Sequence, residues 1–369
     1  MPDPATLVRR AVSELDPYAW ELSTEEVARR HGLRPADVVR FDLNTSPLPP
    51  RIWGEAMEAA TEAALPNEYF DTSYAELTPL LAGYCEVQRD QIVVGAGADE
   101  ILDIVAKTFL DNGDAAVVTP PTYSMYGIVT AQMGASLHRV PLGPEFRLDV
   151  DATLRAANGA KLIWHCNPNS PTGTATEEPA LRRLLEEAPC MVLVDEAYAE
   201  YAGRSVVGLV QEHPNLIVVR TMSKAFAMAG MRLAWCVADA NVVDKLHRVR
   251  PPNSVSRVTA AVGAAALRDI GGMRRNVERV LKEREPLADA LRELGAAVHP
   301  SVTNFLLTDW GSPEEAQRVA DWLEGRGLVV RNFADHPLLP GHLRITVRIA
   351  EENARLVGAL TELRASAAR

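Results

Sequence analysis

The sequence predicts an α/β protein, with a large domain built on a mostly parallel sheet and a smaller α+β domain after it. Short apolar runs recur between residues 91 and 237, and segments with helical periodicity separate most of them. Strands that alternate with helices are typical of a parallel sheet whose two faces are both covered by helices. The candidate strands lie at residues 91–94, 115–119, 136–140, 161–166, 190–194, 216–220 and 233–237.

The chain of 369 residues is longer than one ordinary domain, and its residue pattern changes twice along the sequence. Residues 1–45 carry scattered prolines and one short helical segment near residues 24–31, which indicates an arm rather than a domain. Residues 46–258 form the predicted large domain, and residues 259–369 the smaller one. The smaller domain is marked by a charged helix at 273–294 and two short strands at 303–308 and 343–347.

The composition argues against several classes of protein. Lys and Arg number 38 against 49 Asp and Glu, and the net charge of −11 argues against binding to nucleic acid or to an anionic membrane. No apolar stretch is long enough to span a bilayer, and the N-terminus lacks the apolar core of a signal peptide. The cysteines are scattered without the spacing of a zinc site, so we expect no metal, reduced buried thiols and a cytoplasmic protein. They are Cys85, Cys166, Cys190 and Cys236.

Lys224 is the candidate reactive residue. It follows the apolar strand at 216–220, within the segment RTMSKAFAMAGMR at residues 220–232. Loops at the carboxyl ends of parallel strands line the ligand crevice, so this lysine is placed to project into a site. A lysine attacks carbonyl groups when its ammonium form is disfavoured, and Arg232 in the same crevice would have that effect. A single loop lysine is far more often merely exposed to solvent, so the assignment depends on its neighbours.

The turn GAGADE at residues 95–100 joins the strand at 91–94 to a helix. Free backbone N–H groups and the positive end of the helix dipole make such a turn a phosphate site. A dinucleotide fingerprint is the rival interpretation. It requires a third glycine where this chain has Glu100, and an acid near the end of the next strand, which here ends at Thr119. The sequence therefore favours a single phosphate.

Two more strand ends carry informative side chains. Asp195 follows the apolar strand at 190–194, and we expect its carboxylate to meet a cation rather than a metal, although it could merely cap a turn. Tyr123 supplies an aromatic ring at another strand end, unless it only packs in the core. A phosphate cradle, a buried carboxylate, a reactive lysine and an aromatic plate together indicate a site for pyridoxal phosphate. The lysine would form a Schiff base, and the carboxylate would keep the ring nitrogen protonated.

These segments resemble the fold-type I pyridoxal-phosphate aminotransferases, and within them the histidinol-phosphate aminotransferase group. The resemblance implies a seven-stranded, mostly parallel sheet in the large domain, a homodimer, and a fold-type I active site. It also implies transfer of an amino group between an amino-acid-like donor, by default histidinol phosphate, and a 2-oxo acid such as 2-oxoglutarate. The matching segments, in chain order, are LDPY, EYFDTSYAEL, GAGADE, PPTYSMY, NPNSPTG, VDEAY, RTMSKAFAMAGMR, GLVVR and LRITV.

The resemblance also implies roles for individual residues. Lys224 matches the Schiff-base lysine that moves the proton, Asp195 the partner of the pyridinium nitrogen, and Tyr198 the donor to the cofactor's phenolate oxygen. Arg344 looks like the arginine that pairs with the substrate α-carboxylate. The remaining cofactor-binding matches are Ala98, Asp99, Ser223 and Arg232 at the phosphate, Tyr123 stacked on the ring, Asn169 and Ser170 in the amide-rich turn, and Tyr69, which would reach the cofactor phosphate of the other subunit. The remaining substrate-binding matches are Tyr18 and Arg331 at a distal phosphate, and Asn44 in the early loop.

Four positions depart from the family pattern, and they bear on the substrate more than on the cofactor. Ser170 and Ser46 stand where asparagine is usual, Thr78 where arginine is common, and Arg348 where glycine is usual. Because a fold does not determine a reaction, a lyase, decarboxylase or cyclase of specialised amino-acid biosynthesis that uses the same cofactor is the main alternative. A nicotinamide-dependent oxidoreductase using GAGADE and a catalytically silent binding protein are further alternatives.

Overall fold

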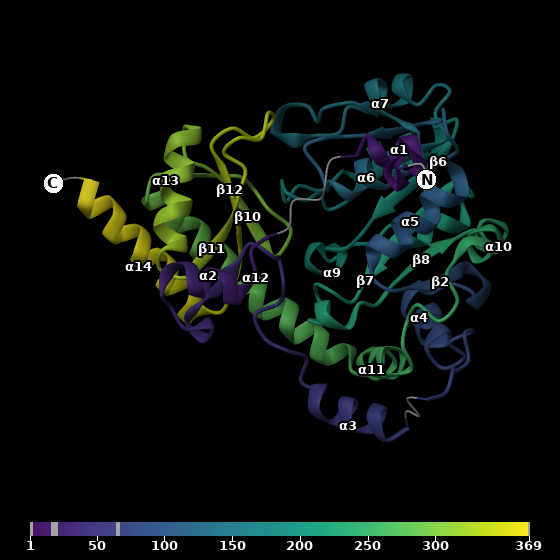
Figure 1. Cartoon of the computed structure of the whole chain (residues 1–369), viewed down its shortest axis with the longest axis horizontal. Coiled ribbons are helices and arrows are strands. Elements are labelled where there is room, and N and C mark those ends of the chain that lie inside the picture. Colours follow the sequence, from purple (N-terminus) through teal and green to yellow (C-terminus); the bar gives the residue numbers. More distant parts are fainter. Residues whose placement is uncertain (1–2, 16–20, 64–66, 368–369) are drawn as a thin grey trace.

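A computed structural model describes residues 3–15, 21–63 and 67–367, which form two sheets with their covering helices (Figure 1). The larger sheet contains the seven predicted strands, each within one residue of its expected bounds, in the order β2-β8-β7-β6-β5-β3-β4. Neighbouring strands are parallel except where β8 pairs with β2 and β7, so the predicted mostly parallel sheet is confirmed. The strands are β2 (Ile92–Gly95), β3 (Ala115–Val118), β4 (Ser136–Arg139), β5 (Leu162–Cys166), β6 (Met191–Asp195), β7 (Leu216–Thr221) and β8 (Ala234–Ala238).

Alternate strand residues of this sheet enter two separate cores, one on each face. Val93 and Trp164 belong to one core, whereas their chain neighbours Val94 and Ile163 belong to the other. Because both faces are buried, the central strands read as continuous apolar runs. The first core is closed by α5 (Ala98–Phe109), α6 (Met125–Gln132) and α10 (Ala240–Val249), and the second by α4 (Leu77–Cys85), α8 (Glu178–Glu187) and α11 (Arg257–Arg268).

The smaller sheet has five strands in the described residues, where two were predicted. Its order is β1-β11-β12-β10-β9, and the predicted strands correspond to β10 (Phe305–Asp309) and β12 (His342–Thr346). The other three are β1 (Val39–Phe41), β9 (Ala297–Val298) and β11 (Leu328–Asn332). β1 and β9 are too short to show a periodic pattern. β1 pairs in parallel with β11, so a segment near the start of the chain completes a sheet made from its end.

Helix α12 (Ile270–Glu293), predicted as a charged helix, runs from beside α11 to the smaller half (Figure 1). We propose that the chain divides into an arm, a larger part and a smaller part, as the sequence predicts, but with the transition along α12 instead of at residue 258. The predicted boundary at residue 258 falls inside α11, which packs against α3 (Trp53–Ala63) and α4 of the larger half. The remaining helices are α1 (Arg10–Ser13), α2 (Thr24–His31, as predicted), α7 (Val150–Ala156), α9 (Ala199–Ala202), α13 (Pro313–Glu324) and α14 (Ala350–Ala367).

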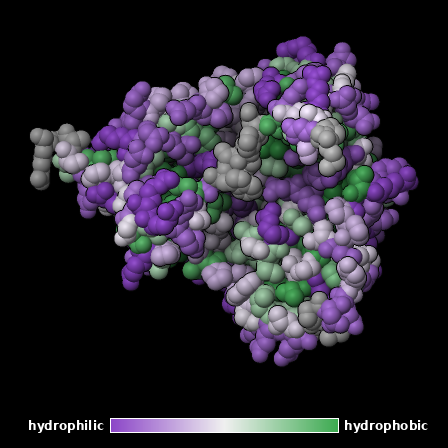
Figure 2. Space-filling model, in the orientation of Figure 1, coloured by the Kyte–Doolittle hydropathy of each residue, from purple (hydrophilic) through white to green (hydrophobic). Residues whose placement is uncertain are grey.

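The surface is largely hydrophilic on the face shown in Figure 2, and hydrophobic residues gather around α11. The exposed large hydrophobic side chains of the described residues include Trp53 and, at 91%, Tyr69. In the described ranges no helix is long and apolar enough to cross a bilayer. All four cysteines are free thiols.

Candidate active site

A cavity of about 410 Å³ opens at the carboxyl ends of the central strands. Cys166, Asp195 and Thr221 line it, and each is the last residue of its strand. This is the edge at which an open α/β sheet binds ligands, and at which the site was predicted. A larger and more open hollow, of about 830 Å³, lies beside Lys161 and Cys190 at the opposite edge of the sheet. The predicted site residues that line the smaller cavity are Asn44, Ala98, Asp99, Tyr123, Ser170, Asp195, Tyr198, Ser223, Lys224, Arg232 and Arg344.

The Lys224 amine lies in this cavity, where Nζ donates a hydrogen bond to the carbonyl oxygen of Leu43 at 3.2 Å. Its nitrogen is 5.8 Å from the centre of the Tyr198 ring. Burial and then the positive charge of Arg344 lower the pKa of Lys224 from 10.5 to about 8. Arg232 acts in the same direction, as expected, but its effect is smaller than that of Arg344.

Asp195 is buried at the end of β6, and burial raises its pKa to about 6. Its Oδ2 accepts a hydrogen bond from the Tyr126 hydroxyl at 2.9 Å, and its Oδ1 accepts one from the backbone N–H of Ala197 at 3.0 Å. Among the described residues the carboxylate thus accepts hydrogen bonds from a tyrosine and an amide, and its pairing with a cation stays a prediction.

Tyr126 has no predicted role, although it lies in the PPTYSMY segment. Its ring stacks on Trp164 with centroids 5.7 Å apart, and it meets Tyr123 edge to face at the same distance. The spacing of the two tyrosines gives no helical signal for this contact, because Tyr126 lies in α6 whereas Tyr123 precedes the helix.

The glycine turn before α5 places its groups around Arg232. Gly97 has φ of +89°, and a Cβ atom there would collide with the Arg232 guanidinium, so this position requires glycine. Arg232 forms an ion pair with Asp99 at 3.2 Å, and the Tyr123 hydroxyl donates to the other Asp99 oxygen at 2.8 Å. The turn thus joins a helix N-terminus to a guanidinium, which is an arrangement suited to a phosphate.

Asn44 and Tyr198 are joined by a hydrogen bond in which the Asn44 amide donates to the Tyr198 hydroxyl at 3.0 Å. Asn44 has φ of +53°, in the left-handed region, and its backbone N–H donates to the Thr346 hydroxyl on β12 at 3.0 Å. Asn44 was predicted to bind substrate, and its hydrogen bond shows that it also orients the Tyr198 hydroxyl.

Arg344 reaches the cavity from β12. Its Nη1 donates to the Ser170 hydroxyl at 3.0 Å, and its Nη2 donates to the carbonyl oxygen of Asp42 at 2.7 Å. Its buried Nε has no hydrogen-bond partner among the described residues. Ser170, one of the departures from the family pattern, thus contacts the arginine assigned to the substrate carboxylate.

Asn169 faces away from the cavity and holds the amide-rich turn together. Its amide donates to the Pro121 carbonyl at 2.9 Å and to the Thr172 hydroxyl at 2.8 Å, and its Oδ1 accepts from Thr122 at 2.6 Å. Its donors are therefore already used within the protein, and Ser170 is the residue of this turn that lines the cavity.

Besides Asn169, three predicted residues lie outside this cavity or cannot be placed. Arg331 lines an adjoining hollow of about 400 Å³, which shares Glu21, Tyr123, Ser170 and Arg344 with the cavity. Tyr69 is exposed on the surface of the protein. Tyr18 lies outside the described residues. Arg348, another departure, forms an ion pair with Glu352 at 2.8 Å and does not line either hollow.

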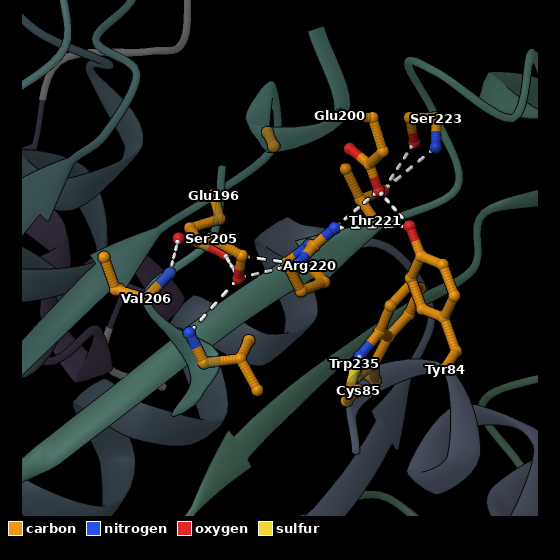
Figure 3. A network of polar contacts seen from close by, with 12 residues as sticks. Tyr84, Cys85, Glu196, Glu200, Ser205, Val206, Arg220, Thr221, Ser223 and Trp235 are labelled. Carbon is orange, nitrogen blue, oxygen red and sulfur yellow. Dashed lines mark hydrogen bonds and ion pairs between the residues drawn. The ribbon is translucent and has the colours of Figure 1, made fainter. Parts of the chain in front are cut away.

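A buried polar cluster, which was not predicted from the sequence, joins the ends of β6 and β7 near Asp195 and Lys224 (Figure 3). Arg220 on β7 donates to Glu196 at 3.3 Å and to Glu200 at 2.7 Å, and all three side chains are less than a tenth exposed. Ser205 and Tyr84 complete the cluster at 3.1 and 3.4 Å from the guanidinium. Glu196 directly follows Asp195, and Arg220 precedes Lys224 by four residues, so the cluster connects the segments that position Asp195 and Lys224.

A metal site is not indicated, because no group of three or more His, Cys, Asp or Glu side chains in the described part of the chain is arranged to hold an ion. The fold and the lysine-centred cavity instead define a protein of the aminotransferase class. Residues 37–360 match the family of class I and II aminotransferases, and the chain belongs to this family.

Relatives of known name cover nearly the whole chain. It is 35% identical to the histidinol-phosphate aminotransferase of Roseiflexus castenholzii, over 97% of this chain and 98% of that protein. It is 37% identical to the enzyme of the same name from Symbiobacterium thermophilum, over 96% and 97%. A crystal structure of histidinol-phosphate aminotransferase from Sinorhizobium meliloti in complex with pyridoxal-5'-phosphate superposes with a TM-score of 0.89 at 25% identity, covering 97% of this chain and 98% of that one.

The predicted class, a fold-type I aminotransferase similar to the histidinol-phosphate group, is therefore confirmed. The nicotinamide interpretation of GAGADE is wrong, and Glu100 shows a physical reason. Its Oε2 accepts from the backbone N–H of Ala96 at 2.6 Å and from the Ser254 hydroxyl at 2.8 Å. The carboxylate thus fills the place at the turn where a dinucleotide would need glycine.

Proposed function

We propose that this protein transfers an amino group from histidinol phosphate to a 2-oxo acid such as 2-oxoglutarate, with pyridoxal phosphate as its cofactor. The observation that carries the proposal is the Lys224 amine, whose pKa is lowered to about 8 in the cavity that also holds Asp195 and Arg344. The names of the relatives, which share about a third of their residues with this chain, support the choice of donor.

The cavity suits pyridoxal phosphate in its charges and in its shape. The residues that would hold the phosphate are Ala98, Asp99, Ser223 and Arg232, because they combine a helix N-terminus, a hydroxyl and a guanidinium. Asp195 would hold the ring nitrogen, Tyr123 would contact the ring, and Tyr198 with Ser170 would lie at its oxygen. When bound, pyridoxal phosphate supplies an electron sink that stabilises the charge on the substrate carbon as its proton leaves.

Lys224 is the proton carrier in this proposal. With a pKa of about 8, about one amine in ten is neutral at pH 7, against about one in three thousand for a lysine with the ordinary value of 10.5. The lowered pKa therefore makes Lys224 an effective base near neutral pH. Its contact with the Leu43 carbonyl directs the amine across the cavity.

Asp195 and Arg344 supply the fixed charges. The pKa of Asp195, about 6, leaves most of this buried carboxylate ionised at pH 7, where it attracts a protonated ring nitrogen strongly. Arg344 would bind the substrate carboxylate next to the reacting carbon through its guanidinium. Its Nε, which has no partner among the described residues, is a donor that this carboxylate can use.

We further propose that the protein acts as a homodimer in the cytoplasm. The exposed Tyr69 ring supports the dimer, because it is 91% exposed and tyrosine is enriched at protein–protein interfaces. In the resemblance this residue reaches the cofactor phosphate of the other subunit. Four free thiols suit a reducing compartment.

An absorbance titration of the holoenzyme tests the reaction. Histidinol phosphate alone should convert the bound cofactor to its amino form, recovered as pyridoxamine phosphate, and 2-oxoglutarate should restore the original spectrum. Lys224→Ala should abolish the conversion, whereas Lys161→Ala, at the other edge of the sheet, should leave it unchanged. Release of carbon dioxide or phosphate without pyridoxamine phosphate would instead establish the lyase alternative.

A further inference from the structure

Glu21 places a carboxylate at the arginine that the substrate's distal anion is expected to use. Its Oε1 accepts a hydrogen bond from Nη1 of Arg331 at 2.6 Å. The two side chains are 30% and 36% exposed, so the ion pair faces solvent rather than a closed core. Glu21 lines both the cofactor cavity and the adjoining hollow that contains Arg331. Its carboxylate therefore stands between the reacting centre and the distal arginine.

The backbone at Glu21 is held close to a fixed helix. Ser23, two residues on, caps α2 by accepting a hydrogen bond from the backbone N–H of Glu26 at 3.1 Å. At its other end α2 is tied to α13 of the smaller half, because His31 and Arg30 both contact Glu324. Rotation of the Glu21 side chain is therefore sufficient to release Arg331 without moving the helix.

The charges around this ion pair balance one substrate anion, not two. Arg331 and Arg344 lie directly opposite each other on the antiparallel strands β11 and β12, which is unfavourable for two like charges. Asp42 is already paired with Arg40 at 2.6 Å. Among the described residues, Glu21 is the carboxylate that pairs with Arg331. The two arginines and Glu21 then carry one net positive charge, which one substrate carboxylate next to the reacting carbon neutralises.

A substrate with a second, distal anion changes this balance. Its phosphate or carboxylate needs the Arg331 donors that Glu21 occupies, and it is repelled by the Glu21 charge. A substrate without a distal anion leaves the ion pair in place and meets a neutral distal hollow. The two substrate classes thus require different positions of the same side chain.

We infer that Glu21 is a specificity-determining residue, an internal anion that neutralises Arg331 in the absence of a distal anion and that the distal phosphate or carboxylate of a substrate displaces. The inference rests on the proposed function, because it assigns Arg331 to the distal anion. Glu21 weakens the binding of anionic substrates and leaves the binding of substrates with an uncharged end unaffected. Glu21 therefore reduces the preference for substrates with a distal anion that Arg331 alone would produce.

Glu21→Gln in the holoenzyme tests this inference. The substitution keeps the size of the side chain and removes the charge, so the KM for 2-oxoglutarate should fall about three- to tenfold. The KM for pyruvate, which has no distal anion, should stay within about twofold. The dissociation constant of inorganic phosphate, measured by calorimetry on the holoenzyme, should fall by the same factor as the KM for 2-oxoglutarate. Glu21→Asp, which keeps the charge on a shorter side chain, should give an intermediate effect.

Glu26→Gln is the matched control, because it removes one negative charge from the exposed face of α2 without lining either hollow. It should change none of these constants. A KM for 2-oxoglutarate that rises or stays constant in Glu21→Gln, or a KM for pyruvate that falls equally, would overturn the inference.

The calorimetric measurement separates this inference from the proposed function, because it requires no turnover. If histidinol phosphate is not a donor but phosphate binds more tightly to Glu21→Gln, the proposed donor is wrong and the role of Glu21 stands. If histidinol phosphate is a donor and phosphate binding is insensitive to Glu21, the inference fails alone.

Discussion

Replacing Arg220 by methionine removes the cation that lies between two buried carboxylates. The guanidinium is 6% exposed, and its partners Glu196 and Glu200 are 2% and 5% exposed, at 3.3 and 2.7 Å. Methionine fills much of the same volume, so the main effect is the loss of charge compensation. Breaking a buried ion pair by removing one partner lowers the free energy of unfolding by about 3–5 kcal/mol. With two carboxylates left in one cluster, we expect a value in the upper half of that range.

Calorimetric unfolding at constant cofactor concentration measures this loss. Near 60 °C the unfolding entropy is about 2.1 cal/mol/K per residue, or about 0.8 kcal/mol/K for 369 residues, so Tm should fall by about 5–6 °C. The loss should be larger at pH 8 than at pH 5. Burial already raises the pKa of Glu196, and removing Arg220 raises it further. A carboxyl group with a raised folded pKa stabilises the fold at low pH, and this contribution is lost as the pH rises through that pKa.

Two comparisons make the result specific to the buried cluster. Arg10→Met breaks an exposed ion pair with Glu14 and should leave Tm unchanged. Glu200→Gln combined with Arg220→Met removes one of the two uncompensated charges and should recover part of the lost stability. A fall in Tm of less than about 1 °C in Arg220→Met, or an absence of pH dependence, would refute the reasoning.

Three further predictions concern the cavity. The pKa of Lys224 falls from 10.5 to about 8 in the folded chain. Between pH 8 and pH 10.5 the unfolded chain therefore binds one more proton at this residue than the folded chain does. The cofactor-free protein should therefore gain stability from this group as the pH rises from 8 to 10.5, and unfolding curves of Lys224→Met should lack that gain. Tyr126→Phe removes a hydrogen bond that lowers the pKa of Asp195, so that pKa should rise above about 6 and cofactor binding should weaken at pH 6 more than at pH 8, which equilibrium dialysis measures. Unchanged dissociation constants of the cofactor would show that Tyr126 does not affect cofactor binding through Asp195. Arg331→Ala should raise the KM for 2-oxoglutarate by about tenfold, or about 1.4 kcal/mol, and leave the KM for pyruvate unaltered in steady-state assays. Equal changes for both oxo acids would show that Arg331 does not contact the distal anion.

The larger sheet and the centre of the cavity were predictable because their signals are local. Each central strand is a continuous apolar run, and its last residue or the loop after it carries the polar group. Lys224 and Asp195 could therefore be placed at one edge from strand order alone, without knowledge of any side-chain direction.

Contacts between distant segments were not predictable in this way. The pairing of β1 with β11, the ion pair of Glu21 with Arg331 and the hydrogen bond from Tyr126 to Asp195 each join segments with no shared periodicity. The direction of Asn169 is a different case, because it and Ser170 are neighbouring polar residues of one turn, and only the folded backbone decides which of them faces the cavity.

The pairing of β1 with β11 has a consequence for the order in which the chain assembles. During synthesis the larger sheet is complete once residue 238 has emerged, whereas β1 must wait for the residues of β11 and β12. Asn44 depends on the same event, because its backbone is held by Thr346. Closing so long a loop is slow compared with the pairing of neighbouring strands. A nascent chain therefore carries Lys224 and Asp195 in a finished sheet before Tyr198 receives its partner Asn44, so the catalytic pocket forms later than the sheet that carries its lysine.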